Sequence, residues 1–246
     1  MLYAIGNSSN KDYPQEIFYN SASDMIPMEN VPDIEEVNYY FITDERSEIP
    51  LEEQVEAAVD AGVRMIQLRW KGVSDGVFYD VAERLKDICR GKAIFIVNDR
   101  VDVALAVDAD GVHIGQDDMP PEVVRGLIGE DKILGLSTHD EEQAEEAAPK
   151  ADYIGIGPVH KTTTKEDPDE ELGVRRAVDI CKKIDVPTVA IGGISEKDLP
   201  ELVPPFDMIC AVSDVTRKGE GGEGLKTRME TYELTIKRYK EEAKDD

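Results

Sequence analysis

Residues 93–118 read AIFIVNDRVDVALAVDADGVHIGQDD, and this stretch holds one complete repeat of the pattern that decides the fold. The apolar runs AIFIVN (93–98) and GVHIG (111–115) predict buried strands, and RVDVALAVD (100–108) predicts a short helix between them. Both strands are apolar on both faces, which is typical of strands that other layers cover on each side. The stretch therefore predicts a strand, a helix and a second strand that runs parallel to the first.

The same alternation of short apolar runs and longer amphipathic runs occurs eight times from Val37 onward. The strand candidates are VNYYFIT (37–43), RMIQLR (64–69), AIFIVN (93–98), GVHIG (111–115), KILGLS (132–137), DYIGIG (152–157), PTVAIGG (187–193) and DMICAVS (207–213). The helix candidates are PLEEQVEAAVDAG (50–62), DGVFYDVAERLKDICRG (75–91), RVDVALAVD (100–108), MPPEVVRGLIG (119–129), DEEQAEEAAPK (140–150), GVRRAVDICKKI (173–184), EKDLPELV (196–203) and EGLKTRMETYELTIKRYKEEA (223–243).

The first two helix candidates carry clear start and stop signals. Pro50 stands at the first turn of the first helix and Gly62 follows its last apolar residue. The helical period predicts an inward face formed by Leu51, Val55, Ala58 and Val59. In the second helix, closed by Gly91, it predicts an inward face formed by Val77, Val81, Leu85 and Ile88.

Eight strand–helix pairs within residues 37–242 predict a single-domain α/β protein with a (β/α)8 TIM barrel. Each unit takes roughly 26 residues, which fits a compact barrel. An open doubly wound sheet is the alternative, and we favour the barrel because an eighth unit completes the ring. Residues 1–36 show no sustained period and form an N-terminal extension without an assigned role; packing under the barrel, contacts between subunits and disorder stay open.

Composition limits the partners of the chain. Among 246 residues, 53 acidic and 28 basic side chains leave a formal charge of −25, and the mean hydropathy is −0.40. No stretch approaches the roughly 18 apolar residues of a membrane span. The negative charge opposes binding to nucleic acid or anionic membranes, so anionic ligands must meet local cations. We therefore expect small-molecule partners.

Two further sequence features concern location and cysteine chemistry. The opening MLYAIGNSSNKDY lacks the pattern of a secretory signal, which predicts a cytoplasmic protein. Cys89, Cys181 and Cys210 lie far apart in apolar-periodic segments without a CxxC spacing. They are therefore expected to be core cysteines and not a disulfide framework or a zinc site. The sequence leaves the oligomeric state open, a homo-oligomer included.

Cations follow the second predicted strand. In Gln67-Leu68-Arg69-Trp70-Lys71, alternation places Gln67, Arg69 and Lys71 on one side of the chain, facing the barrel cavity or its mouth. A structural ion pair between Arg69 and an acid is one interpretation. Two cations in so acidic a protein fit an anionic ligand better.

Carboxylates follow the next two strands, in Asn98-Asp99-Arg100 and in Gly115-Gln116-Asp117-Asp118. Each could cap the helix that follows it. Two carboxylate loops beside two cations also suit Mg²⁺, which keeps waters and takes its other ligands from substrate phosphates. His113 and His160 are expected to be bystanders.

The later strand ends carry hydroxyls, ammonium groups and glycines. Ser137, in Ser137-Thr138-His139, is either a helix cap or a ligand-binding hydroxyl. The loop 158–168 holds three threonines and two lysines within five residues, 161–165. Gly192-Gly193 and Val212-Ser213 follow strands seven and eight, where barrels of this kind usually bind phosphate.

These motifs resemble the thiamine-phosphate synthase family over about residues 37 to 240. They are QLRxK (67–71), VNDRVDVALAVDADGVHIGQDD (97–118), ST-H (137–139), TxTK (162–165) and IGGI (191–194). The resemblance implies a transferase of thiamine biosynthesis that joins 4-amino-5-hydroxymethyl-2-methylpyrimidine diphosphate to 4-methyl-5-(2-phosphoethyl)thiazole and releases diphosphate. It also implies a dissociative substitution, in which placed positive charge stabilises the leaving group.

The resemblance further implies a role for each matching position. Asp99 and Asp118 would bind the cofactor Mg²⁺, and Arg69, Lys71 and Lys165 would be catalytic cations. The pyrimidine diphosphate would contact Gln67, Leu68, Arg69, Trp70, Lys71, Asn98, Ser137 and Lys165. The thiazole phosphate would contact Thr162, Thr163, Thr164, Gly192, Gly193, Val212 and Ser213.

Three positions depart from the family pattern: Trp70 replaces the usual acid, Lys161 the usual proline, and Asp214 a small residue beside the phosphate site. An inward-pointing Asp214 would weaken the thiazole-phosphate assignment. Two alternatives remain: a thiazole tautomerase-like isomerase, with which His139 is compatible, and a non-catalytic barrel that binds a phosphate ligand. The pair Asp99 and Asp118, together with Lys165, favours the synthase.

Overall fold

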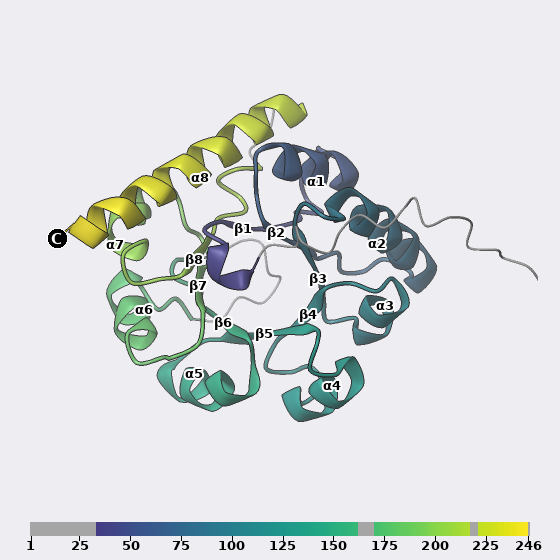
Figure 1. Cartoon of the computed structure of the whole chain (residues 1–246), viewed down its shortest axis with the longest axis horizontal. Coiled ribbons are helices and arrows are strands. Elements are labelled where there is room, and N and C mark those ends of the chain that lie inside the picture. Colours follow the sequence, from purple (N-terminus) through teal and green to yellow (C-terminus); the bar gives the residue numbers. More distant parts are fainter. Residues whose placement is uncertain (1–32, 162–169, 217–220, 246) are drawn as a thin grey trace, which may run out of the picture.

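The computed structural model describes residues 33–161, 170–216 and 221–245. In these ranges one sheet contains eight parallel strands in sequence order. The strands are β1 (Tyr40–Ile42), β2 (Met65–Leu68), β3 (Ile94–Asn98), β4 (Gly111–Ile114), β5 (Ile133–Thr138), β6 (Tyr153–Ile156), β7 (Thr188–Ile191) and β8 (Met208–Cys210). A parallel bridge between Tyr39 and Ile209 brings β8 back beside β1 and closes the ring (Figure 1).

Helices surround this ring, as Figure 1 shows. They are α1 (Leu51–Asp60), α2 (Asp75–Cys89), α3 (Val101–Ala106), α4 (Pro121–Ile128), α5 (Glu141–Ala147), α6 (Val174–Cys181), α7 (Leu199–Leu202) and α8 (Gly221–Asp245). Short 3-10 turns lie at η2 (Ile34–Glu36), η3 (Ala148–Lys150) and η4 (Glu196–Asp198). The predicted (β/α)8 barrel is therefore confirmed, and the open doubly wound sheet is not observed.

The predicted inward face of α2 was wrong by one residue at its start. Val77 is 45% exposed, and the buried face begins instead at Phe78, which is 2% exposed. From Phe78 the helical period leads to Val81, Ala82, Leu85 and Cys89, all of which are buried. Val77 precedes the first of these positions by one residue, a rotation of about 100° that turns it toward solvent.

Alternation along the strands divides the core into two layers. One set of side chains fills the barrel, including Tyr40, Ile96, Tyr153 and Met208. The residues between them point outward and pack against the helices, as Leu68 does. The two layers account for strands that are apolar on both faces, because each strand has a packed layer on either side.

Part of the predicted N-terminal extension contributes to the barrel. Residues 1–32 lie outside the described residues, but η2 is described, and Ile34 packs against the cluster inside the barrel. In Figure 1 this short purple turn lies over the centre of the ring. Ile34 therefore packs at the end of the barrel where the strands begin, whereas Glu35 and Glu36 are exposed.

The three cysteines are buried and free of disulfides, as the sequence predicted. Within the described residues, no helix is both long enough and apolar enough to cross a membrane.

Candidate active site

A cavity of about 100 Å³ opens where the strands end. Six residues that the sequence predicted as site residues line it: Arg69, Ser137, Gly192, Gly193, Val212 and Ser213. The other lining residues are Ile42, Thr138, His139, Gly155, Gly157, Pro158, Ile191 and Cys210. The wall is mostly apolar with a few polar groups, which is the usual character of a small-molecule site.

Arg69 reaches the cavity from the chain that follows β2. Its backbone N–H donates to Thr43 Oγ1 over 2.9 Å, and its guanidinium lies 3.3 Å from Glu45 Oε1. Only 13% of the Arg69 side chain is exposed. The ion pair that the sequence left open is therefore present, and the paired arginine still lines the cavity.

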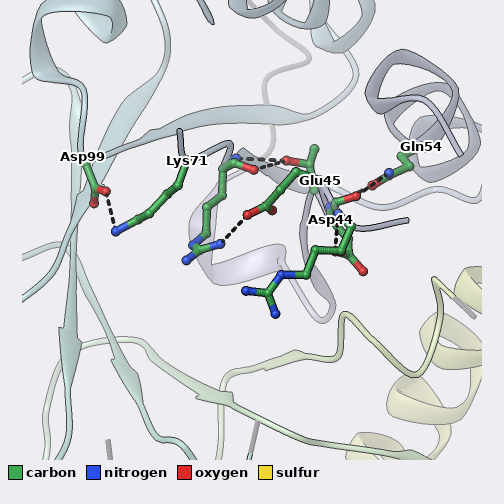
Figure 2. Close-up of polar contacts among 8 residues, drawn as sticks. Asp44, Glu45, Gln54, Lys71 and Asp99 are labelled. Atoms are coloured by element: carbon green, nitrogen blue, oxygen red, sulfur yellow. Dashed lines mark hydrogen bonds and ion pairs between the residues drawn. The ribbon is translucent and has the colours of Figure 1, made fainter. Parts of the chain in front are cut away.

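The loop that carries Glu45 is held by the buried side chain of Gln54, from α1. Gln54 accepts from the Asp44 backbone N–H over 2.9 Å and donates to the carbonyls of Asp44 and Ile49. Figure 2 shows Asp44 beside Gln54 on one side, with Glu45 between them and Lys71. The partner of Arg69 therefore sits on a loop of fixed position.

Lys71 and Asp99 form a second ion pair at the mouth. Lys71 Nζ lies 3.3 Å from Asp99 Oδ2, as Figure 2 shows, and 61% of the lysine side chain is exposed. Burial raises the pKa of Asp99, the neighbouring Asp118 carboxylate raises it further, and Lys71 opposes both effects. Asp99 and Asp118 are thus close enough to repel each other when both are ionised.

Neither carboxylate caps the helix that follows it. Arg100 and Pro120 occupy the cap positions of α3 and α4, and neither helix has a side-chain cap. Asp99 adopts a left-handed backbone with φ of 60°, and Asp118 Oδ2 accepts from the Gly115 N–H over 2.7 Å. The capping interpretation of the sequence is not observed for Asp99 or Asp118.

The carboxylate pair fits Mg²⁺ by its chemistry. Among the described residues no cluster of three or more His, Cys, Asp or Glu side chains could hold a metal. Two carboxylates supply only part of a magnesium coordination sphere, and Mg²⁺ commonly completes it with water and substrate phosphates. Mutual repulsion between Asp99 and Asp118 is what a divalent cation would relieve.

Ser137 reaches the cavity from the inward face of β5. Its hydroxyl lies 2.8 Å from His113 Nε2, and its carbonyl accepts from Gln116 Nε2. Asp140, not Ser137, caps α5. The hydroxyl is therefore held by a histidine inside the barrel, and His113 itself does not line the cavity.

Glycine is needed at both positions of the loop after β7. Gly192 and Gly193 have φ of 96° and 63°, which L residues with side chains rarely adopt. A Cβ on Gly192 would overlap Pro158, and one on Gly193 would overlap His160. The loop after β7 consequently packs directly on the loop after β6.

The carboxylate of Asp214 is directed away from the cavity. Tyr232, on α8, donates its hydroxyl to Asp214 Oδ2 over 2.6 Å. Val212 and Ser213 line the cavity, whereas Asp214 does not. The repulsion that Asp214 would cause in an inward position is absent.

Other predicted site residues lie elsewhere. Leu68 is 0% exposed in the layer between barrel and helices, so its side chain cannot contact a ligand at the mouth. Trp70 also packs toward the helices and borders a different surface hollow. Gln67 is buried inside the barrel, and Asn98 ends β3 at an inward position. Thr162, Thr163, Thr164 and Lys165 lie outside the described residues.

Sequence analysis missed much of the apolar wall and the support of the polar groups. Ile42, Ile191 and Cys210 occupy inward positions at the ends of their strands, so alternation alone could have indicated them. Glu45 had no local signal. His160 contacts Asp198 over 3.0 Å and does not line the cavity.

Comparison with protein families gives one model, described as thiamine monophosphate synthase, that matches residues 39–215. Among curated relatives, thiamine-phosphate synthase of Methanosarcina barkeri is 45% identical over 187 residues, 74% of this chain and 84% of that protein. Thiamine-phosphate synthase of Archaeoglobus fulgidus is 45% identical over 205 residues, 83% of this chain and 95% of that protein.

Among solved structures, thiamine phosphate pyrophosphorylase from Pyrococcus furiosus is similar with a TM-score of 0.74 and 35% identity. The similarity covers 84% of this chain and 98% of that protein. A second thiamine phosphate pyrophosphorylase, from Bacteroides thetaiotaomicron, has a TM-score of 0.61 but only 15% identity, and supports the fold alone.

Proposed function

This chain belongs to the thiamine monophosphate synthase family and is a transferase, and we propose that it makes thiamine phosphate with Mg²⁺ as cofactor. Its substrates would be 4-amino-5-hydroxymethyl-2-methylpyrimidine diphosphate and 4-methyl-5-(2-phosphoethyl)thiazole. The observation that carries the proposal is the shared cavity: Arg69 and Ser137 line the same 100 Å³ space as Gly193 and Ser213. One cavity thus offers groups for both substrates.

The cations after β2 would bind the diphosphate. Arg69 offers a planar fork of donors that suits phosphate oxygens, and Lys71 offers an exposed ammonium. Both already have a carboxylate neighbour, so a diphosphate would compete with Glu45 and Asp99 for them. Lys165 would add a third cation and lies outside the described residues.

Asp99 and Asp118 would hold the Mg²⁺. When bound, the ion supplies Lewis-acid stabilisation of the diphosphate oxygens. The chain itself brings the two carboxylates together from the ends of β3 and β4 and places Lys71 beside them. Leu68 and Trp70 are left out of the proposed contacts, because their side chains pack toward the helices.

The reaction would be a substitution at the pyrimidine methylene carbon. The bond from this carbon to the diphosphate oxygen breaks, and its electron pair leaves with the diphosphate. The lone pair of the thiazole nitrogen then forms the new carbon–nitrogen bond. Arg69 and Lys71 would stabilise the charge that grows on the departing oxygen, and the apolar wall formed by Ile42, Ile191 and Val212 would hold the rings.

The thiazole phosphate would lie at the loops after β7 and β8. Gly192 and Gly193 line the cavity in the left-handed conformation that glycine adopts easily, and Ser213 adds a hydroxyl. The Tyr232 hydroxyl holds the Asp214 carboxylate on the α8 side. The threonines at 162–164 belong to this part of the proposal and lie outside the described residues.

A thiazole isomerase remains the second candidate, because His139 lines the cavity. Its Nδ1 lies 2.7 Å from the Gly157 carbonyl, which holds the ring at the cavity wall. An isomerase needs neither a carboxylate pair nor cations for a diphosphate. The arrangement of Lys71, Asp99 and Asp118 therefore favours the synthase over the isomerase and over a barrel that only binds.

The test is incubation of purified protein with the pyrimidine diphosphate, the thiazole phosphate and Mg²⁺, followed by measurement of thiamine phosphate and released diphosphate. We expect both products in equal amounts, and none with EDTA. Arg69→Gln should lower kcat about 10²- to 10³-fold, as loss of one placed donor does. The matched control is Arg84→Gln, which removes an exposed arginine paired with Glu52.

Two results would contradict this proposal. Folded protein that makes no product would move the assignment to the isomerase or the binding barrel, and interconversion of thiazole phosphate tautomers would identify the former. Product formation that persists in EDTA would show that the reaction does not need the metal.

A cytoplasmic location is also part of the proposal.

A further inference from the structure

A continuous chain of hydrogen bonds crosses the interior of the barrel beneath the cavity. Gln67 Nε2 donates to the Tyr40 hydroxyl over 2.6 Å, and the Tyr40 and Tyr153 hydroxyls are 2.8 Å apart. Tyr153 lies 2.9 Å from His113 Nδ1, and His113 Nε2 lies 2.8 Å from Ser137 Oγ. We call these five residues the relay. It joins β2, β1, β6, β4 and β5 in that order.

The relay is buried and closely packed. Gln67 and Tyr40 are each 1% exposed, Tyr153 is 0% and His113 is 8%. The Tyr40 and Tyr153 rings meet edge to face, and the His113 and Tyr153 ring centroids are 5.5 Å apart. Burial raises the pKa of both phenols well above the ordinary tyrosine value, so each keeps its one proton.

A glycine on β5 makes room for this contact. Gly135 points into the barrel, and a Cβ there would overlap the Tyr153 hydroxyl and His113 Nδ1. The Gly135 backbone is not in the left-handed region, so space is the reason for glycine at this position. The fold thus reserves volume for the junction between Tyr153 and His113.

The protons in the relay can be counted from one end. Gln67 donates through Nε2, and among the described residues the Tyr40 hydroxyl contacts only Gln67 and Tyr153. With Gln67 Nε2 as the donor, the single Tyr40 proton goes to Tyr153, and the single Tyr153 proton goes to His113 Nδ1. A histidine that accepts at Nδ1 carries its proton on Nε2, and this proton goes to Ser137 Oγ.

The count leaves one proton unused by the relay, that of the Ser137 hydroxyl, and Ser137 lines the cavity. We propose that Tyr40, Tyr153 and His113 are positioning residues that hold the relay in this one direction and make Ser137 a hydrogen-bond donor to the ligand. Its acceptor would be a ring nitrogen of the pyrimidine substrate, and this part of the inference rests on the proposed function.

The opposite direction makes a different site. Rotation of the Gln67 amide by 180° would place its oxygen on Tyr40, and every hydrogen bond of the relay would then reverse. His113 would carry its proton on Nδ1, and Ser137 would donate to His113 and offer the ligand only an acceptor. The tautomer of His113 therefore reports the direction of the whole relay.

The first test measures this tautomer without any substrate. Protein labelled with ¹⁵N in its three histidines is examined by NMR, and the signals of His113 are identified by their loss in His113→Gln. We expect the neutral Nε2–H tautomer. An Nδ1–H tautomer would overturn the proposed direction, whatever the enzyme catalyses.

The second test removes one hydroxyl from the relay. Tyr153→Phe keeps the ring but leaves His113 Nδ1 without its donor, and the matched control Tyr39→Phe removes a buried hydroxyl that donates to the Ala211 carbonyl outside the relay. We expect kcat/KM for the pyrimidine diphosphate to fall about tenfold in Tyr153→Phe, the worth of one buried hydrogen bond. The KM for the thiazole phosphate should stay unchanged, and Tyr39→Phe should match the parent in both constants.

Equal kinetic constants in Tyr153→Phe and Tyr39→Phe would overturn the positioning role. Thermal unfolding of both variants distinguishes a general loss of stability from a local effect on the site. If the parent protein makes no thiamine phosphate, the proposed function fails, and the histidine tautomer still decides the direction of the relay.

Discussion

Arg69 and Lys71, at the mouth of the barrel, each have a carboxylate neighbour. Glu45 lies beside Arg69 and Asp99 beside Lys71, both at 3.3 Å. Both cations are therefore already paired within the chain, whose formal charge is −25. An arginine with a single carboxylate contact keeps donors for phosphate, since the guanidinium carries five N–H groups. In the proposed complex, a phosphate would share these two cations with Glu45 and Asp99.

At the residue scale, the pair Asp99 and Asp118 gives a prediction about the Mg²⁺ dependence of activity and the pKa of Asp99. Asp118→Asn replaces a carboxylate that we propose as a Mg²⁺ ligand with a neutral amide, and it also removes the charge that raises the pKa of Asp99. We expect the Mg²⁺ concentration for half-maximal activity to rise by at least about tenfold, because even indirect partners of metal ligands are worth that much. The pKa of Asp99, followed by NMR titration without metal, should fall.

Asp117→Asn is the control for this prediction, because Asp117 is the exposed neighbour on the same loop. It should leave both the Mg²⁺ dependence and the Asp99 titration as in the parent. In the parent, Mg²⁺ should bind less tightly as the pH falls through the raised pKa of Asp99, since the ligand must be ionised. Unchanged Mg²⁺ dependence in Asp118→Asn would show that the metal lies elsewhere.

At the element scale, the loop after β7 gives a prediction about backbone conformation. Gly193→Ala places a Cβ against His160 at a φ of 63°, so we expect a loss of about 1–3 kcal/mol in the free energy of unfolding. The matched control is Gly126→Ala on α4, where nothing lies within 4 Å of the new Cβ. That change should stabilise the protein by about 0.5–1 kcal/mol. Urea unfolding of both variants measures the two effects.

The Gly193→Ala protein should also bind the thiazole phosphate more weakly, because the loops after β6 and β7 must separate. The KM for the thiazole phosphate is the readout, and the KM for the pyrimidine diphosphate serves as the internal control. A variant as stable as the parent would mean that the close packing of Gly193 on His160 is not needed.

The elements themselves were largely predictable, because their signals are local. Each strand in the structure overlaps its predicted run, and Gly62 follows α1 with a left-handed φ of 83°, as a helix stop requires. The prediction that Val77 faces inward was wrong, because the helical period of a sequence fixes the direction of a helix face only to about one residue. The cavity at the strand ends was predictable as the candidate site because barrels place their active sites there.

The relay could not have been predicted from the sequence. Tyr40 and Tyr153 are 113 residues apart, and their contact depends on the register of several strand pairs. Alternation says that both side chains point inward, but not that their hydroxyls lie at the same height. The contact of Glu45 with Arg69 could not be predicted either, since it depends on a loop held by Gln54.

At the scale of the whole molecule, the long helix α8 packs across the place where the barrel closes. It contacts both α1 and α7, next to the ring junction between β8 and β1 (Figure 1). Tyr232 of α8 stacks on Tyr39, which carries the bridge to Ile209. The same helix binds Asp214 and so affects the loop after β8. One helix therefore contacts both the junction of the ring and the loop after β8.

A buried acid on this helix also makes the stability of the whole molecule depend on pH. Glu233 is 4% exposed on the inner face of α8, and its Oε1 is among the few buried side-chain oxygens of the described residues without a hydrogen-bond partner. Burial raises the pKa of Glu233 to about 7, and the nearby Lys237, Lys240 and Arg64 oppose this only in part. The fold therefore favours the protonated, uncharged carboxyl.

The sign of the effect follows from the two pKa values. A folded-state pKa of about 7 lies above the ordinary 4.5, so the contribution of Glu233 is fully present below pH 4.5 and is lost as the pH rises through 7. Glu233→Gln replaces the carboxyl with a group that stays neutral. We expect the variant to be more stable than the parent at pH 8, by an amount of order 1 kcal/mol or more, and to differ little at pH 5.

Urea unfolding of parent and variant between pH 5 and pH 8 measures this difference. Glu241→Gln is the control, because Glu241 is exposed near the end of the same helix and loses the same charge. If the two variants show the same pH dependence, the net charge of −25 explains the change, since any lost acid relieves general repulsion. A gain confined to Glu233→Gln would instead locate the destabilisation at the buried face of α8, where the closed ring depends on it.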